Sequence, residues 1–185
     1  MPWREDLPVN TPLSPYAATK KGAELMAHSY HLLYGLDITI VRYFTVFGPA
    51  GRPDMSIFRF IKWIDEGKPL ELFGDGSQSR DFTYIDDIAD GVVRALDRTA
   101  AGTPPHKLYN LGNHRSEKLT DFLAEIERAL QKKAIIEPRP LPAGDVLKTY
   151  ADIEASTRDL GFKPTTPIKV GIPKFVAWYR EFYGA

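Results

Sequence analysis

The sequence of 185 residues contains no cysteine. This absence excludes disulfide bonds, zinc–thiolate sites and cysteine nucleophiles, and it is typical of a protein from a reducing compartment. Net charge is also absent, because 24 Lys and Arg residues balance 24 Asp and Glu residues. A chain without a global positive field has little general attraction for nucleic acid or for an anionic membrane. Any anionic ligand must therefore be bound by individually placed Arg or Lys residues.

Long apolar runs and a signal-peptide pattern are missing as well. No apolar run approaches the ~20 residues that a membrane-spanning helix needs. The first six residues contain neither the basic region nor the apolar region of a secretory signal. We therefore expect a cytoplasmic protein that binds neither membrane nor nucleic acid. The residues that are present support a folded core, since 43% of them are hydrophobic and 12% are aromatic.

The spacing of apolar residues and the positions of proline and glycine predict a mixed α/β chain. Residues 1–15 contain four prolines and predict an extended lead-in. The β-rich segment 36–43 follows a helix directly, which is typical of half a βαβ unit in a parallel sheet. The other predicted elements are strands at about 70–73, 107–111 and 134–139, and helices at about 55–66, 86–98, 120–132, 152–160 and 167–183.

The first helix is predicted from Tyr16 to Tyr34. Ser14 and Pro15 provide an N-cap and a first helical residue, and Gly35 provides a stop signal. Five apolar residues support the helical period, namely Ala18, Leu25, Met26, Leu32 and Leu33.

Tyr16 and Lys20 stand four residues apart and therefore share one face of this helix. A phenol has an ordinary pKa near 10, so it is a poor base at neutral pH unless a nearby cation stabilises the phenolate. Lys20 can supply that charge, and the pair can then exchange a proton with a sugar hydroxyl or carbonyl. The alternative is an ordinary surface helix with a half-buried tyrosine.

Thr45 and Arg52 form a second candidate, at the exit of the predicted strand 36–43. This strand continues into a Gly48-Pro49 loop, and ligands of open α/β sheets bind at the carboxyl ends of strands. Thr45 offers a hydroxyl, and Arg52 offers a guanidinium suited to a carboxylate or phosphate. The alternative is that Thr45 only ends the strand and Arg52 is a solvated loop residue.

The glycine-containing turn at 74–82 is not predicted to be a dinucleotide-binding loop. Ser79 stands where the fingerprint requires its third glycine, and the extended segment 82–84 follows instead of a helix. Arg80 is predicted to ion-pair a ligand phosphate, with Asp81 holding its guanidinium. The alternative is that both residues only brace the loop.

The histidines are interpreted as structural or exposed, and the aromatic residues near the end of the chain as core. The four histidines share no metal-ligand spacing and have no nucleophile partner, so we predict no metal site; they are His28, His31, His106 and His114. The aromatic residues of the segment 175–179 have helical spacing and are predicted to be core.

Five motifs in this order resemble the NAD-dependent epimerase/dehydratase family, the extended short-chain dehydrogenases. They are residues 14–20, 42–49, 74–87, 109–112 and 144–146. Within that family, residues 44–49 followed by 51–55 are most similar to the UDP-glucuronate 4-epimerases. The resemblance covers the whole chain but only about the C-terminal half of a family member.

The resemblance implies the fold and the organisation of the chain. We expect the C-terminal part of a Rossmann-like doubly wound sheet plus a small α/β substrate-binding lobe, with the N-terminal cofactor-binding strands missing. Residues 1–50 would be the remnant of the Rossmann domain and residues 51–185 mainly the lobe, with 86–111 returning to the Rossmann sheet. Relatives pair through the helix from Tyr16 to Tyr34, which implies a homodimer for the full-length enzyme.

The resemblance also implies an NAD-dependent epimerase that oxidises the sugar transiently at C4 and interconverts UDP-glucuronate and UDP-galacturonate. Tyr16 would be the catalytic acid/base, and Lys20 would stabilise its phenolate. Both would contact the cofactor, Lys20 through the nicotinamide ribose. Thr45 and Arg52 match substrate-recognising positions and would hold the glucuronate carboxylate.

The UDP moiety of the substrate is assigned to two further residues by the same resemblance. Arg80 matches the arginine that contacts the diphosphate, and Asp145 lies in a nucleotide-contacting segment. Pro142 stands where some epimerases carry a second diphosphate arginine. The Gly-rich turn that receives the NAD pyrophosphate in this family cannot be located. We therefore expect the 185-residue chain alone to bind NAD weakly or not at all and to be inactive.

Two other functions are compatible with these residues. A sugar-nucleotide 4,6-dehydratase shares the Tyr-x-x-x-Lys pattern, although Thr45 and Arg52 argue against it. A non-catalytic fragment that binds a UDP-sugar or dimerises would use the same lobe and helix.

Overall fold

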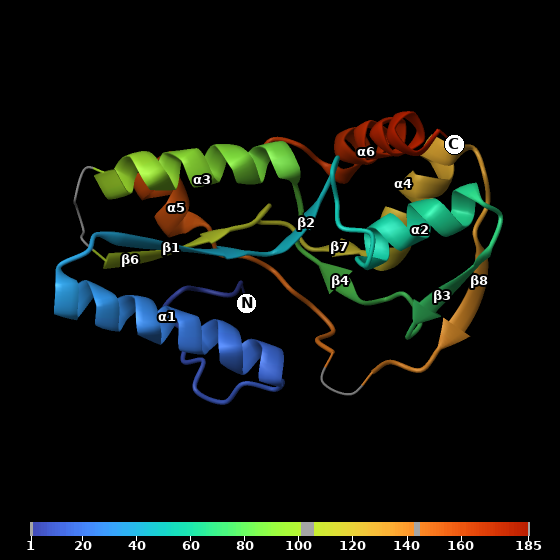
Figure 1. Cartoon of the computed structure of the whole chain (residues 1–185). Helices are drawn as coiled ribbons and strands as arrows, with labels where there is room; N and C mark the ends of the chain where they lie inside the picture. Colours follow the sequence, from blue (N-terminus) through green and yellow to red (C-terminus); the bar gives the residue numbers. More distant parts are fainter. Residues whose placement is uncertain (1, 101–105, 143–144, 185) are drawn as a thin grey trace.

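The chain folds around several small parallel strand pairs, described here from a computed structural model that covers residues 2–100, 106–142 and 145–184. The strand β1 (Ile38–Tyr43) pairs in parallel with β6 (His106–Leu111). Helix α1 (Pro15–Tyr34) lies on one face of this pair, and α3 (Ile85–Ala100) and α5 (Glu154–Leu160) lie on the other (Figure 1). Helices on both faces of parallel strands confirm the predicted α/β class.

A second group of elements lies beyond the carboxyl ends of β1 and β6, on the right of Figure 1. It contains three more strand pairs, of which two are parallel. Three helices cover them. The elements of this group are β2 (Thr45–Phe47) with β5 (Phe82–Tyr84), β3 (Pro69–Phe73) with β8 (Ile135–Arg139), antiparallel β4 (Ser79–Arg80) with β7 (Glu117–Lys118), and α2 (Ser56–Asp65), α4 (Leu119–Leu130) and α6 (Ile168–Tyr183).

Local signals place the element ends close to the predicted positions. The Ser14 hydroxyl accepts a hydrogen bond from the Ala17 amide at 3.2 Å, and Gly35 ends α1 with a φ of 66°. Helix α5 begins two residues later than predicted. The Asp152 carboxylate accepts the Glu154 amide at 3.0 Å, so residues 152–153 precede the helix and cap it.

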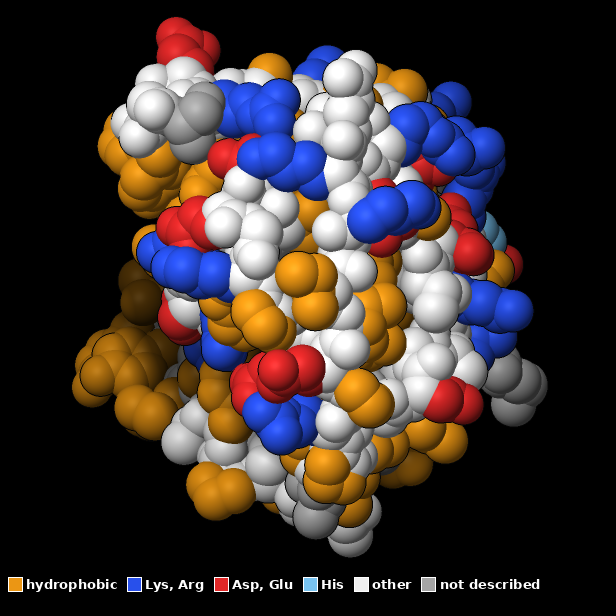
Figure 2. Space-filling view, turned by 90° about the vertical axis from the view of Figure 1, so that its right-hand side faces the viewer, with side chains coloured by type: hydrophobic (Ala, Val, Ile, Leu, Met, Phe, Trp, Pro, Cys, Tyr) orange, Lys and Arg blue, Asp and Glu red, His pale blue; other side chains and the backbone are white. Residues whose placement is uncertain are grey.

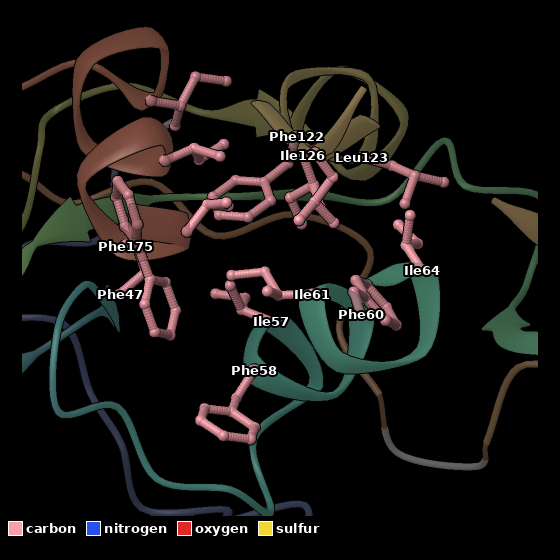
Figure 3. Close-up of a cluster of buried hydrophobic side chains, with 14 of the residues drawn as sticks. Phe47, Ile57, Phe58, Phe60, Ile61, Ile64, Phe122, Leu123, Ile126 and Phe175 are labelled. Atoms are coloured by element: carbon pink, nitrogen blue, oxygen red, sulfur yellow. The ribbon is translucent and has the colours of Figure 1, made fainter. Parts of the chain in front are cut away.

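The largest hydrophobic core joins β2 to helices α2, α4 and α6 (Figure 3). Phe47 from β2 meets Phe122 from α4 edge to face, with ring centroids 5.3 Å apart. Phe175, Val176 and Tyr179 of α6 are buried, as predicted for the segment 175–179, whereas Trp178 is half-buried. A smaller core lies between α3, α5 and β6.

The lead-in before α1 is not simply an extended loop. Trp3 forms a parallel β-bridge with Ala151, in which the Trp3 amide donates to the Tyr150 carbonyl at 2.6 Å. The sequence prediction missed this bridge because the two residues are far apart along the chain. It holds the start of the chain beside the carboxyl end of β6, where Asn110 donates to the Trp3 carbonyl at 2.8 Å.

Helix α1 exposes the residues on which its prediction depended. Leu25, Met26, Leu32 and Leu33 are between 58% and 73% exposed, and no α1 residue is fully buried. The half-buried residues of α1 are instead small, polar or charged: Ala17, Lys21, Gly22, Glu24, Ala27 and His31. The apolar stripe therefore faces outward from β1 and β6.

Charged side chains of both signs are interspersed on the face formed by the right-hand side of Figure 1 (Figure 2). This distribution agrees with the balanced composition and gives no large field of one sign. Among the described residues, no helix is long and apolar enough to cross a membrane.

Candidate active site

The first turn of α1 presents Tyr16 and Lys20 together. The Lys20 ammonium nitrogen lies 5.4 Å from the centre of the Tyr16 ring, as expected for residues one turn apart. Tyr16 is 71% exposed, so its hydroxyl is accessible to a ligand. This end of α1 points toward the second group of elements, past the carboxyl ends of β1 and β6 (Figure 1).

Thr45 belongs to β2, and Arg52 lies in the loop between β2 and α2. Thr45 opens this strand, and its amide donates to the Asp81 carbonyl at 3.0 Å. The Arg52 guanidinium is exposed and forms an ion pair with Asp54, whose hydrogen bond and charge raise the pKa of Arg52 above its usual value.

Arg80 and Asp145 meet although 65 residues separate them in sequence. The Arg80 guanidinium donates to the Asp145 carboxylate at 2.8 Å, and the Arg80 side chain is only 19% exposed. The resemblance had assigned both residues to UDP, and the structure brings them together. Gly144 of the same motif lies outside the described residues.

Asp81 does not hold the Arg80 guanidinium, contrary to the sequence prediction. Asp81 is fully buried. Its carboxylate accepts the amides of Asn113 at 2.6 Å and Ala151 at 3.0 Å, and the Thr83 hydroxyl at 3.1 Å. Burial raises the pKa of Asp81, although these hydrogen bonds act in the opposite direction. Adjacent residues of an extended segment point to opposite sides, which explains why Arg80 and Asp81 separate.

Two further residues near the site were not selected from the sequence. Glu24 of α1 and Arg42 of β1 form an ion pair with two hydrogen bonds, of 2.6 and 2.8 Å. The only available signal was Arg42 itself, a charged residue within a mostly apolar strand, which requires a partner when it is covered.

Three of the four histidines gather where α1 passes the start of β6. His106 lies 4.8 Å from His28 and 5.6 Å from His31 between ring centres. Within the described ranges, no group of three or more His, Asp or Glu residues is arranged to hold a metal ion. The interpretation of His106 as a structural residue agrees with its partial burial.

In the glycine turn before β4, the donors of Ser77 are already occupied. The Ser77 amide and hydroxyl both donate to the Asp75 carboxylate, the amide at 2.9 Å. A turn whose donors already bind a carboxylate is a poor phosphate cradle. The sequence also contains no Gly-x-Gly-x-x-Gly pattern.

Parallel strands covered by helices on both faces, with a Tyr–Lys pair at the start of a covering helix, are typical of Rossmann-like α/β proteins. A family model described as the NAD dependent epimerase/dehydratase family matches residues 2–112, and the chain belongs to this family. The predicted resemblance is therefore confirmed.

Individual relatives agree with this assignment. The chain is 52% identical over 181 residues to the UDP-glucuronate 4-epimerase of Thermodesulfobacterium geofontis, and it covers 54% of that protein. Its fold matches the UDP-glucuronic acid 4-epimerase of Bacillus cereus, solved with UDP-glucuronic acid and NAD, with a TM-score of 0.90 at 37% identity. It covers 57% of that chain with 99% of its own length. It also matches DesIV, a dTDP-glucose 4,6-dehydratase of Streptomyces venezuelae, with a TM-score of 0.90 at 30% identity and 56% coverage of that chain. The chain thus spans about half the length of these relatives.

Proposed function

We propose that this chain carries the proton-transferring helix and the sugar-nucleotide lobe of a UDP-glucuronate 4-epimerase. The observation that carries the proposal is the placement of Tyr16 and Lys20 together on one turn of α1. A phenol, an ammonium and an arginine suit a sugar that must lose a hydroxyl proton and that carries a carboxylate. The similarity to two UDP-glucuronate 4-epimerases supports the same substrate.

In the proposed reaction, Tyr16 takes the proton of the C4 hydroxyl and returns one to the C4 oxygen after the 4-keto sugar has turned over. Lys20 stabilises the phenolate between these two proton transfers. NAD, when bound, supplies the hydride acceptor and donor for C4. Thr45 and Arg52 bind the carboxylate, so that the sugar is held by its charged end while its ring turns.

Arg80 and Asp145 are proposed to bind the UDP moiety. The Arg80 guanidinium suits the diphosphate because it is always charged and has several donors. Asp145 is 38% exposed and already hydrogen-bonded to Arg80, so it orients that guanidinium toward a ligand. The resemblance assigns both residues to UDP, and their ion pair supports a shared role.

The described residues fit only part of NAD. Tyr16 and Lys20 have the chemistry to contact the nicotinamide ribose. The one described turn with two closely spaced glycines, at 74–77, uses its donors on Asp75 and so does not fit the pyrophosphate. We therefore expect weak or no NAD binding by the 185-residue chain.

Calorimetric titration of this chain tests the proposal. We expect saturable binding of UDP-glucuronate, weaker binding of UDP-glucose, and loss of that preference in Arg52→Ala. Arg94→Ala, in an exposed ion pair on α3, is the matched control and should bind as the parent does. Equal binding of the two sugars by the parent would overturn the carboxylate assignment. Titration with NAD and assay for UDP-galacturonate check the expected weak cofactor binding and lack of turnover.

We further propose that the outer face of α1 pairs with a second copy of the chain. Its exposed apolar residues support this, since contiguous apolar surface on one helix is typical of a protein interface; they are Leu25, Met26, Tyr30, Leu32 and Leu33.

A further inference from the structure

The inner face of α1 lacks the large apolar side chains that usually lock a helix on a sheet. Its half-buried residues are the small Ala17, Gly22 and Ala27 and the polar or charged Lys21, Glu24 and His31. Interdigitated side chains normally fix both the rotation and the axial position of a packed helix. Packing alone therefore constrains the axial position of α1 only weakly.

The Glu24–Arg42 ion pair supplies a directional contact on this face. Arg42 Nε donates to Glu24 Oε1 at 2.6 Å, and Arg42 Nη2 donates to Glu24 Oε2 at 2.8 Å. The side chains are 24% and 15% exposed, and Arg42 lowers the pKa of Glu24. Two parallel bonds between planar groups define an orientation as well as a distance.

The two partners stand in positions that matter for the candidate site. Glu24 lies one helical turn beyond Lys20 and two turns beyond Tyr16, which is about 6 Å and about 12 Å along the axis. Arg42 lies on β1, three residues before Thr45. Arg42 also donates to the Glu5 carbonyl at 3.5 Å, so it contacts the segment that leads into α1.

We propose that Glu24 and Arg42 are positioning residues, which set the register of α1 on β1 and thereby place Tyr16 and Lys20 relative to Thr45. The proposal rests on the proposed function for the roles of these three residues. A displacement of the acid/base by 1 Å is sufficient to reduce catalysis by about a hundredfold, so a register contact at this place has a direct consequence for the reaction.

The absence of cysteine allows a direct test of the helix register. Spin labels are attached through Ala23→Cys on α1 and Ala89→Cys on α3, both at exposed positions on opposite faces of β1 and β6. Pulsed electron resonance then measures the distance between them. We expect a narrow distribution in the parent, and a distribution about twice as wide or clearly shifted in Glu24→Ala.

A matched control separates register from general stability. Glu66→Gln removes one partner of the exposed Glu66–Lys68 pair, which does not involve α1, and should leave the distance distribution unchanged. Arg42→Lys keeps the charge but not the two parallel bonds, so it should broaden the distribution to an intermediate extent, and it serves if Glu24→Ala does not fold. An unchanged distribution in folded Glu24→Ala and Arg42→Lys would overturn the proposal.

The distance measurement does not require catalytic activity. Failure of UDP-glucuronate binding would refute the proposed function and still leave the register test decisive. If the chain turns over UDP-glucuronate, Glu24→Gln should lower kcat about tenfold or more with KM nearly unchanged, because the substrate contacts at Arg52 and Arg80 are retained. A rise in KM with constant kcat would contradict a positioning role.

Discussion

At the scale of single residues, the carboxylate of Asp81 connects three segments of the chain. It accepts hydrogen bonds from the Asn113 amide after β6, from the Ala151 amide before α5, and from the Thr83 hydroxyl on β5. A buried carboxylate is unfavourable unless such donors compensate for its lost hydration. The Asp81 backbone carbonyl also accepts a hydrogen bond from the amide of Thr45, a proposed substrate-binding residue. Asp81 therefore connects these three segments to Thr45 on β2.

His106 provides a prediction at the same scale. Burial lowers the pKa of His106, and the neighbouring His28 and His31 lower it further. Both neighbouring rings belong to α1, and the buried His106 Nε2 has no hydrogen-bond partner within the described part of the chain.

A lowered pKa in the folded state means that the unfolded state takes up the proton first. The free energy of unfolding should therefore fall as the pH drops below about 6.5, the ordinary pKa of histidine, until the folded state is protonated as well. His106→Gln should show a smaller decrease between pH 7 and pH 5 in urea unfolding. His114→Gln, a histidine outside the cluster, should retain the decrease of the parent. Equal slopes for His106→Gln and the parent would refute this prediction.

At the scale of elements, the glycines of α1 and α6 differ in the space around them. A Cβ at Gly171 of α6 would lie 2.7 Å from ring atoms of both Phe47 and Tyr84, which are buried and cannot move freely. A Cβ at Gly22 of α1 would meet nothing within 4 Å. The close packing of α6 against the core therefore requires glycine at position 171, whereas α1 has space for a larger residue at position 22.

Two alanine substitutions should consequently change stability in opposite directions. Gly171→Ala should lower the free energy of unfolding by about 1–3 kcal/mol, because overpacking outweighs the better helix propensity of alanine. Gly22→Ala should raise it by up to about 1 kcal/mol, because only the propensity term changes. Urea unfolding of both variants measures this, and a stabilised Gly171→Ala would show that α6 can move away from β2 and β5.

At the scale of the whole molecule, α1 has two different sides. One side packs on β1 and β6, and the other exposes apolar side chains. Its sheet side is held by small residues and the Glu24–Arg42 pair, while Leu25 and Leu32 are 58% and 69% exposed. Exposed leucines two turns apart on one helix are a common feature of helix-mediated dimers.

The proposed dimer predicts a change in mass. Light scattering should give about twice 20.8 kDa for the parent, and about 20.8 kDa for the double variant Leu25→Glu with Leu32→Glu, because charge disfavours burial of this face. Leu96→Glu, at an exposed leucine of α3, is the control and should keep the dimer mass. A monomeric parent would refute the dimer.

Sequence patterns predicted the elements well where the signals were local. The N-cap at Ser14 and the stop at Gly35 bound α1 within one residue of its predicted ends, because caps and left-handed glycines act over a few residues. The outward orientation of Leu25 and Leu32 was not predictable in this way. An apolar period shows that one helix face differs from the other, but not which partner covers that face.

The sequence by itself determined the α/β class, the family resemblance and the shared helix face of Tyr16 and Lys20, because these follow from periods and motifs that act within a few residues. The tertiary structure alone decided that Arg80 binds Asp145 and not Asp81, that Asp81 is a buried junction, and that Glu24 meets Arg42. These contacts join residues separated by 18 to 70 positions, and only the packing of strands and helices brings them within hydrogen-bond distance.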